Sequence, residues 1–114
     1  MYYVGIDISK YKHTFVIASH LGEVIQKPMD FDNSHLGFAQ FLDKLKPFDS
    51  NQLKIGFEST GHYSANLKQF LHNQGYSFYQ LNPHLVKKFS LSLSSRKAKT
   101  DKIDCLAIAK FLMT

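Results

Sequence analysis

Two segments of the sequence share a pattern that places an acidic side chain on an apolar strand. In VGIDIS (residues 4–9), Asp7 is flanked by isoleucines, and in IGFEST (residues 55–60), Glu58 follows a phenylalanine. An ionised carboxylate in an apolar layer is costly unless a nearby charge compensates it. A glycine two residues before each acid lies on the same face of its strand and leaves room there for a ligand or for another backbone.

A second pair of acids lies near the end of the chain. Asp101 and Asp104, in KTDKIDCLAIAKF (residues 99–111), are three residues apart and therefore on one face at the start of a predicted helix. Clusters of carboxylates suit hard divalent cations such as Mg²⁺ or Mn²⁺. Two such ions about 4 Å apart can activate a nucleophile and stabilise a leaving oxygen in phosphodiester chemistry. The four acids therefore predict a metal site, whose charge would compensate Asp7.

Each acid other than Asp7 also has a simpler interpretation, and these stay open. Asp101 can interact favourably with the helix dipole, Asp104 can be solvated, and Glu58 can reach water at a strand end or help to cap the next helix. The six histidines lack the spacing of a zinc site and are predicted to lie mostly on the surface. Cys105 is flanked by apolar residues and is predicted to be buried and inert.

Basic side chains gather in one part of the sequence. Between residues 84 and 102 there are six lysines or arginines and one acid: Lys87, Lys88, Arg96, Lys97, Lys99 and Lys102 against Asp101. Such a run is typical of a solvated loop or of a surface that contacts phosphates without reading sequence. Lys10 and Lys12, in the turn after the first strand, add to this predicted surface, and the formal net charge of +5 favours a polyanionic partner.

Hydrophobic periodicity predicts the elements that position these residues. Strands are expected at residues 2–8, 13–19, 24–31, 53–58 and 76–81. A first helix is expected after a cap at Asp32 or Asn33, and a second after a cap at Ser59 or Thr60, ending at Gly75. A third helix is expected from Pro83, with Asn82 as its cap, and a fourth from Thr100 onward. Residues 90–99 are expected to form an exposed loop. This order predicts a mixed α/β sheet, with three antiparallel strands and then parallel strands, flanked by helices.

The composition sets the class of protein. An apolar fraction of 44% over 114 residues indicates one globular domain, residues 1–114. A single cysteine excludes an internal disulfide and a cysteine-based zinc site, and it fits a reducing cytoplasm. We find neither a signal peptide nor a membrane span.

The last predicted helix is apolar on nearly every side and still helical in pattern at Thr114. We therefore expect a longer protein that supplies a partner surface, the alternative being a short helix buried in its own domain.

Four motifs together resemble a known family. GIDISK, ESTGHY, LNPHLVKKF and KTDKIDCLAIAKF, in this order and spacing, are similar to the amino-terminal domain of the DEDD-type insertion-sequence transposases, a family that includes the recombinase that inverts pilin genes. The resemblance covers essentially the whole chain. Cys105 departs from it, since the family more often has alanine there.

The resemblance implies a RuvC-like, RNase H-like fold close to that of Holliday-junction resolvases. It implies that the four acids of the family name are Asp7, Glu58, Asp101 and Asp104, binding Mg²⁺ or Mn²⁺. It further implies DNA and a structured guide RNA as partners, a bacterial cytoplasmic location and a full-length homo-oligomer. A carboxy-terminal domain with a nucleophilic serine is absent from this chain, so complete recombination is not expected from it.

Other functions compete with a transposase domain that cleaves and exchanges DNA strands. A stand-alone junction-resolving nuclease would use the same acids. A non-catalytic nucleic-acid-binding remnant of a transposase would bind metal and nucleic acid without cutting DNA. The actin-like sugar kinases also begin with a GID strand, but their first turn offers glycine to phosphate. The turn here, Ser9 to Lys12, contains no glycine, which disfavours a kinase.

Overall fold

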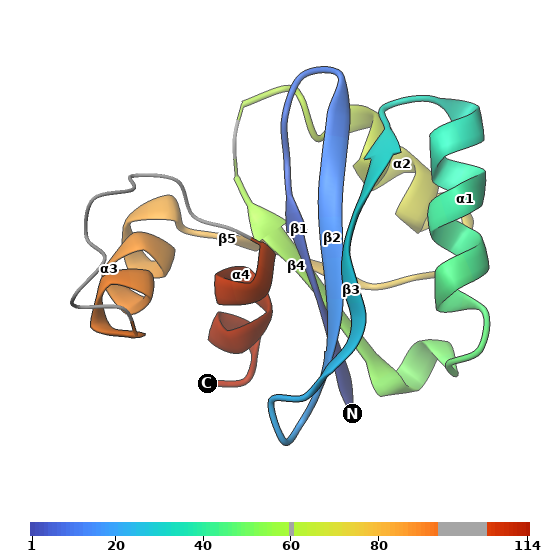
Figure 1. Cartoon of the computed structure of the whole chain (residues 1–114). Helices are drawn as coiled ribbons and strands as arrows, with labels where there is room; N and C mark the ends of the chain where they lie inside the picture. Colours follow the sequence, from blue (N-terminus) through green and yellow to red (C-terminus); the bar gives the residue numbers. More distant parts are fainter. Residues whose placement is uncertain (60, 94–104) are drawn as a thin grey trace.

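The computed structural model describes residues 1–59, 61–93 and 105–114 (Figure 1). Its strands are β1 (Tyr2–Asp7), β2 (Lys12–Ser19), β3 (Val24–Asp32), β4 (Leu53–Glu58) and β5 (Phe78–Leu81). Its helices are α1 (His35–Leu45), α2 (Ala65–Asn73), α3 (Pro83–Leu93) and α4 (Cys105–Leu112), with a 3-10 turn at Ser50–Gln52. All five predicted strands are present, within two residues of the expected bounds.

The strands form one sheet in the order β3-β2-β1-β4-β5. β2 pairs antiparallel with both β1 and β3, whereas β4 pairs parallel with both β1 and β5. The predicted mixed sheet is thus confirmed. Pro28 is accommodated because β3 is an edge strand and its pairing with β2 shifts register between Phe15 and Ile17.

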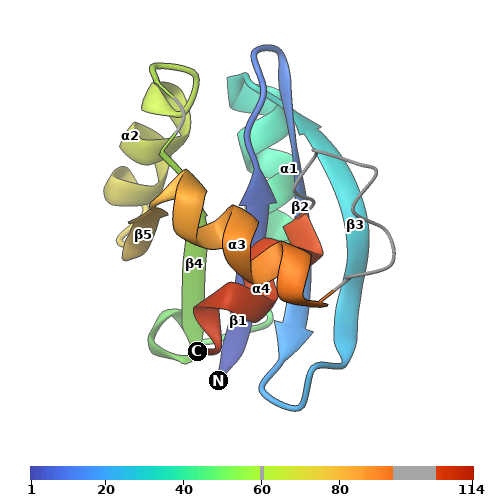
Figure 2. The same ribbon diagram turned by 90° about the vertical axis from the view of Figure 1, so that its left-hand side faces the viewer.

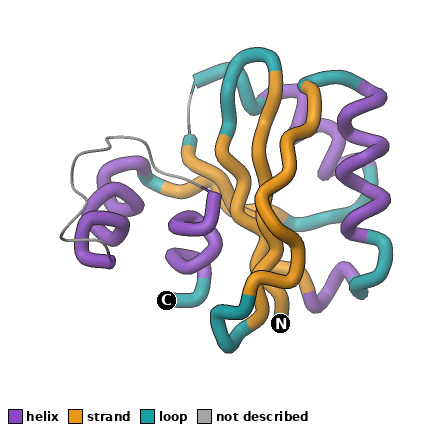
Figure 3. Tube along the Cα trace, viewed as in Figure 1, coloured by secondary structure: helices purple, strands orange, loops and turns teal. Residues whose placement is uncertain are grey.

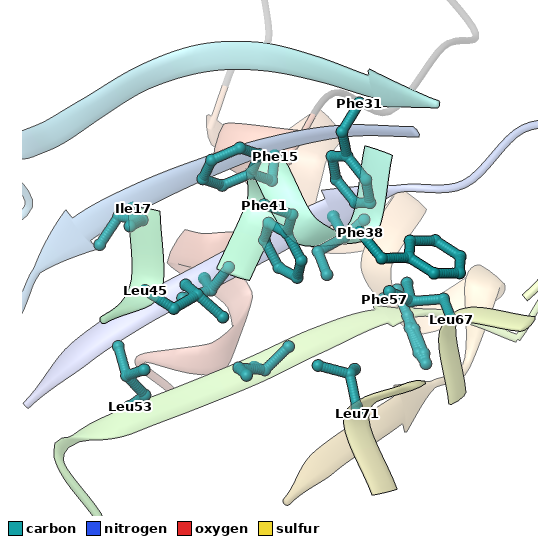
Figure 4. Close-up of a cluster of buried hydrophobic side chains, with 13 residues drawn as sticks. Phe15, Ile17, Phe31, Phe38, Phe41, Leu45, Leu53, Phe57, Leu67 and Leu71 are labelled. Atoms are coloured by element: carbon teal, nitrogen blue, oxygen red, sulfur yellow. The ribbon is translucent and has the colours of Figure 1, made fainter. Parts of the chain in front are cut away.

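Helices cover both faces of the sheet. α1 and α2 lie on one face, and α3 and α4 lie on the other (Figures 1 and 3). The main core is on the α1 and α2 side, where phenylalanines from β2, β3, β4 and α1 pack with aliphatic side chains (Figure 4). A smaller apolar cluster on the opposite face joins Val16 and Ala18 of β2 to Cys105 and Ala109 of α4.

Tertiary contacts set the helix starts, and two predicted caps are wrong. α1 is capped by Ser34, whose Oγ accepts a hydrogen bond from the Gly37 N–H at 3.2 Å. α2 begins at Ala65, well after the predicted cap, and the Ser59 N–H donates instead to the carbonyl of Leu81, the last residue of β5. The predicted end of α2 is confirmed, since Gly75 follows the helix with φ of +80°.

α3 is longer than the sequence suggested. Its predicted cap is confirmed, since Asn82 Oδ1 accepts a hydrogen bond from the His84 N–H at 2.8 Å. The helix continues to Leu93, so residues 90–93 are helical where an exposed loop was expected. The rest of that loop, and the predicted helix start at Thr100, lie outside the described residues.

α4 packs against the glycines that precede the two acids. A Cβ added to Gly5 would overlap the Cys105 carbonyl oxygen and lie 2.5 Å from the Ala109 nitrogen, and one added to Gly56 would lie 2.6 Å from Leu112 Cδ2. The space above the glycines is therefore filled by a helix. The apolar composition of α4 is largely explained within this domain, and the expectation of a longer chain stays a prediction. None of the helices in the described ranges is long and apolar enough to cross a bilayer.

Candidate metal and nucleic-acid site

Asp7 and Glu58 end two neighbouring parallel strands. The register of β1 and β4 pairs Ile6 with Phe57, so the next residue on each strand is the acid. Both acids lie on the face that carries Gly5 and Gly56, and both are half-buried. Because adjacent strands are about 4.8 Å apart, the structure brings these two carboxylates together as the sequence pattern predicted.

The electrostatics of Glu58 are consistent with this proximity. Burial raises the pKa of the Glu58 carboxyl, and the negative charge of Asp7 raises that pKa further. Both causes disfavour two ionised carboxylates at this place, and a bound cation would oppose both. The donor set consists of carboxylate oxygens, which are the ligands that Mg²⁺ and Mn²⁺ prefer.

The other two predicted acids, Asp101 and Asp104, lie outside the described residues. Within the part of the chain that the structure describes, no group of three or more metal-binding side chains gathers. Of the four predicted ligands, the structure therefore describes Asp7 and Glu58.

The turn between β1 and β2 lies at the same end of the sheet as the acids. Lys10 Nζ is 5.1 Å from the centre of the Tyr11 ring, and the ring is 75% exposed. Lys12 Nζ forms an exposed ion pair with Asp30 at 3.2 Å, which weakens its attraction for a phosphate.

A buried histidine supports this turn, and the sequence analysis missed it. His13 is fully buried, and its Nδ1 accepts a hydrogen bond from the Ser9 N–H at 3.2 Å. Burial lowers the pKa of His13, while the neighbouring Asn33 side chain opposes that effect. The signal was available, because His13 precedes Phe15 and Ile17 at the spacing of one strand face.

Asn33 connects the same turn to the start of α1. Its backbone N–H donates to the Tyr11 carbonyl at 2.8 Å, and its side-chain Nδ2 donates to the Lys10 carbonyl at 3.2 Å. Asn33 is thus committed to the turn, which explains why Ser34, and not Asn33, caps α1.

A comparison with protein families assigns the chain to one of them. The model of the DEDD transposases of the IS110 type, described as "Transposase", matches residues 4–114. This chain belongs to that family. Membership implies that DNA is a partner of this IS110-type transposase domain. No curated protein sequence matches the chain.

Solved structures show the fold of the transposase domain. It is similar to RuvC of Thermus thermophilus, with a TM-score of 0.66 and 17% identity, over 99% of this chain and 92% of that chain. The T. thermophilus RuvC structure in complex with a Holliday junction substrate matches with a TM-score of 0.63 and 15% identity, over the same shares. The transposase domain therefore has a RuvC-like fold.

The predicted basic surface of the transposase domain is described only in part. Lys87 and Lys88 are exposed neighbours on α3, which lies on the α4 side of the sheet (Figure 2). The remaining predicted contacts, Arg96, Lys97, Lys99 and Lys102, lie outside the described residues.

Proposed function

We propose that this domain is the metal-binding, nuclease-type part of an IS110 transposase, which acts in DNA strand cleavage and exchange. The observation that carries this proposal is the Asp7–Glu58 pair, where two parallel strands of a RuvC-like sheet end side by side and the pKa of Glu58 is raised. Mg²⁺ or Mn²⁺ bound there would supply Lewis acidity at a scissile phosphate.

The remaining two ligands in this proposal are Asp101 and Asp104. Asp104 is bonded directly to Cys105, and the Cys105 carbonyl lies against Gly5, two residues before Asp7. Two residues of a strand span about 7 Å. The point at which the chain enters α4 is thus close to the acid pair, which supports a common site for all four carboxylates.

The roles of the side chains follow from their charges. The carboxylates would hold the cation, which would supply positive charge for a phosphate at this end of the sheet. Lys10, Lys87 and Lys88, with the basic residues beyond the described ranges, contact backbone phosphates and give affinity without sequence choice. A serine nucleophile in a second domain, a structured guide RNA and a homo-oligomeric full-length protein belong to the same proposal.

A metal titration tests the site. We expect Mn²⁺ binding, followed by calorimetry or by the paramagnetic resonance of free Mn²⁺, to weaken at least about tenfold in Asp7→Asn and in Glu58→Gln. Asp49→Asn is the matched control, because Asp49 is exposed and lies before β4, at the opposite end of that strand from Glu58. Equal Mn²⁺ affinity in wild type, Asp7→Asn and Glu58→Gln would refute the assignment.

A cleavage assay then separates the remaining functions. Duplex DNA and a four-way junction are incubated with the domain and Mn²⁺, with Asp7→Asn as the inactive reference. Cleavage of the junction alone would favour a junction-resolving nuclease. Metal binding and salt-dependent DNA binding without cleavage would favour a non-catalytic fragment, in which the acids position DNA for a nucleophile elsewhere.

A further inference from the structure

The tip of the β1–β2 turn presents an aromatic ring to solvent. Tyr11 is 75% exposed and follows Asp7 by four residues. Four residues of extended chain span at most about 14 Å, so the Tyr11 backbone stays within the length of a few nucleotides of the acid pair. An exposed tyrosine of this kind contributes little to the fold.

The backbone that carries this ring is held in place. The Asn33 backbone and side chain donate hydrogen bonds to the Tyr11 and Lys10 carbonyls, and the Ser9 N–H donates to buried His13. Three hydrogen bonds thus fix a turn whose tip is exposed. Because a tyrosine side chain has only two rotatable angles, a ring on a fixed backbone loses little conformational entropy when it binds a flat partner.

The charge beside the ring indicates the kind of partner. Lys10 Nζ lies 5.1 Å from the centre of the Tyr11 ring, so a flat face and a cation are presented together. A nucleotide offers the matching pair, a flat base and an anionic phosphate, and aromatic residues with neighbouring cations bind single strands in this way.

We propose that Tyr11 is a stacking site for an unpaired nucleobase beside the acid pair. This proposal rests on the proposed function, which places the scissile strand at Asp7 and Glu58. In an intact duplex both faces of each base are covered by neighbouring bases, so the ring can stack only where a base is unpaired or lies at an end. The substrate class is therefore a strand with unpaired bases near the scissile phosphate, in DNA or in RNA.

The test compares Tyr11→Leu with Tyr11→Phe, which keeps the ring. The probes are single-stranded DNA and RNA of one sequence carrying 2-aminopurine, whose fluorescence falls on stacking, and relaxed circular duplex DNA, which has no ends. We expect Tyr11→Leu to weaken single-strand binding about 5- to 150-fold and to abolish the fluorescence change. Tyr11→Phe should bind like wild type, and duplex affinity should be equal in all three proteins.

Three outcomes would overturn the proposal: unchanged single-strand affinity in Tyr11→Leu, an equal loss on single strand and duplex, or a loss in Tyr11→Phe as large as in Tyr11→Leu. The DNA and RNA arms show which strand supplies the base. Because Tyr11 is exposed, unfolding curves should coincide for the three proteins, which separates a binding defect from misfolding.

The stacking site and the proposed function can fail separately. Asp7→Asn should lose metal binding yet keep the 2-aminopurine signal. If Asp7→Asn binds metal normally while Tyr11→Leu loses the signal, the metal site is refuted and the stacking site stands. If Asp7→Asn loses metal and Tyr11→Leu keeps the signal, only the stacking site is refuted.

Discussion

At the scale of single residues, Asp7 and Glu58 are held in an electrostatic conflict. β1 and β4 end side by side, so two half-buried carboxylates share one face of the sheet. The sequence predicted the acids because a carboxylate on an apolar strand is rare without a compensating charge. The sequence could place the two acids close together only on the condition that β1 and β4 are neighbouring strands. It could not show that pairing, because it depends on contacts about fifty residues apart.

The conflict predicts a change in the titration of Glu58. In Asp7→Asn, the pKa of the Glu58 carboxyl should fall toward the ordinary value of 4.5 but stay above it, because burial is the larger cause of the shift. The measurement is a carbon-13 NMR titration of the Glu58 carboxyl without divalent metal. A full return to the ordinary pKa would mean that Asp7, and not burial, dominates.

The same shift predicts a stabilising substitution. A pKa raised in the folded state means that the charged Glu58 disfavours folding, so the penalty grows as pH rises from 4.5 through the folded pKa. Glu58→Gln should therefore stabilise the metal-free protein at pH 7, by no more than about 1 kcal/mol because the carboxyl is partly solvated. The gain should vanish below pH 4.5, as measured by urea unfolding across this range.

His13 predicts the opposite dependence on pH. Burial lowers its pKa, so the unfolded chain takes up a proton first, and stability should be lost as pH falls below 6.5 toward the folded pKa. The Glu58 carboxyl acts in the opposite direction, because its penalty on folding falls as pH falls, so the effect of the histidine is isolated by comparison with a variant that lacks it. His13→Gln should flatten the loss between pH 7 and pH 5.5, whereas exposed His20→Gln should not. Parallel curves for wild type and His13→Gln would exclude His13 as the cause.

At the scale of elements, the strands were predicted more accurately than the helix starts. Apolar runs bounded by turn residues define strands locally, and residues 53–58 were expected as observed. Asp32, Asn33 and Ser34 are all good caps, and the choice among them depends on hydrogen bonds to a distant turn. The partner of α4 could not be read from its composition, because an apolar helix looks the same whether a sheet or another protein covers it.

The contact of α4 with the sheet predicts unequal costs for two glycine substitutions. Gly5→Ala meets the backbone of α4 at Cys105 and Ala109, whereas Gly56→Ala meets the end of the Leu112 side chain, which can rotate. We expect Gly5→Ala to lower the free energy of unfolding by about 2–3 kcal/mol and Gly56→Ala by less than about 1 kcal/mol. Urea unfolding measures both, and equal costs would show that α4 shifts freely on the sheet.

At the scale of the whole molecule, three exposed lysines lie toward the acid-bearing end or face of the sheet, whereas others, such as Lys44 and Lys46 at the end of α1, lie across the sheet from α3. Lys10 is at the tip of the β1–β2 turn, and Lys87 and Lys88 are on α3 (Figure 2). The order of elements along the chain was enough to predict a mixed sheet, because three meandering strands pair as neighbours. The strand order itself requires β4 to cross to the far side of β1, which local patterns do not encode.

This charge distribution predicts which lysines contact nucleic acid. In Lys87→Gln/Lys88→Gln, the slope of log affinity against log salt for duplex DNA should become shallower by about 1–2, since each lost phosphate contact removes about 0.9. The matched control is Lys44→Gln/Lys46→Gln, which removes two exposed charges from the end of α1 across the sheet. Equal slopes for the two double variants would show that α3 is not the binding face.

The packing of α4 on β1 also has a consequence for the order of synthesis. β1 is synthesised before α4, yet among the described residues it is α4, about a hundred residues later in the chain, that packs against the glycine of β1. A nascent chain therefore carries Gly5 and the neighbouring Asp7 without this cover until α4 has been synthesised. A contact this distant along the chain slows folding, and it ties completion of the acid-bearing face to the synthesis of α4.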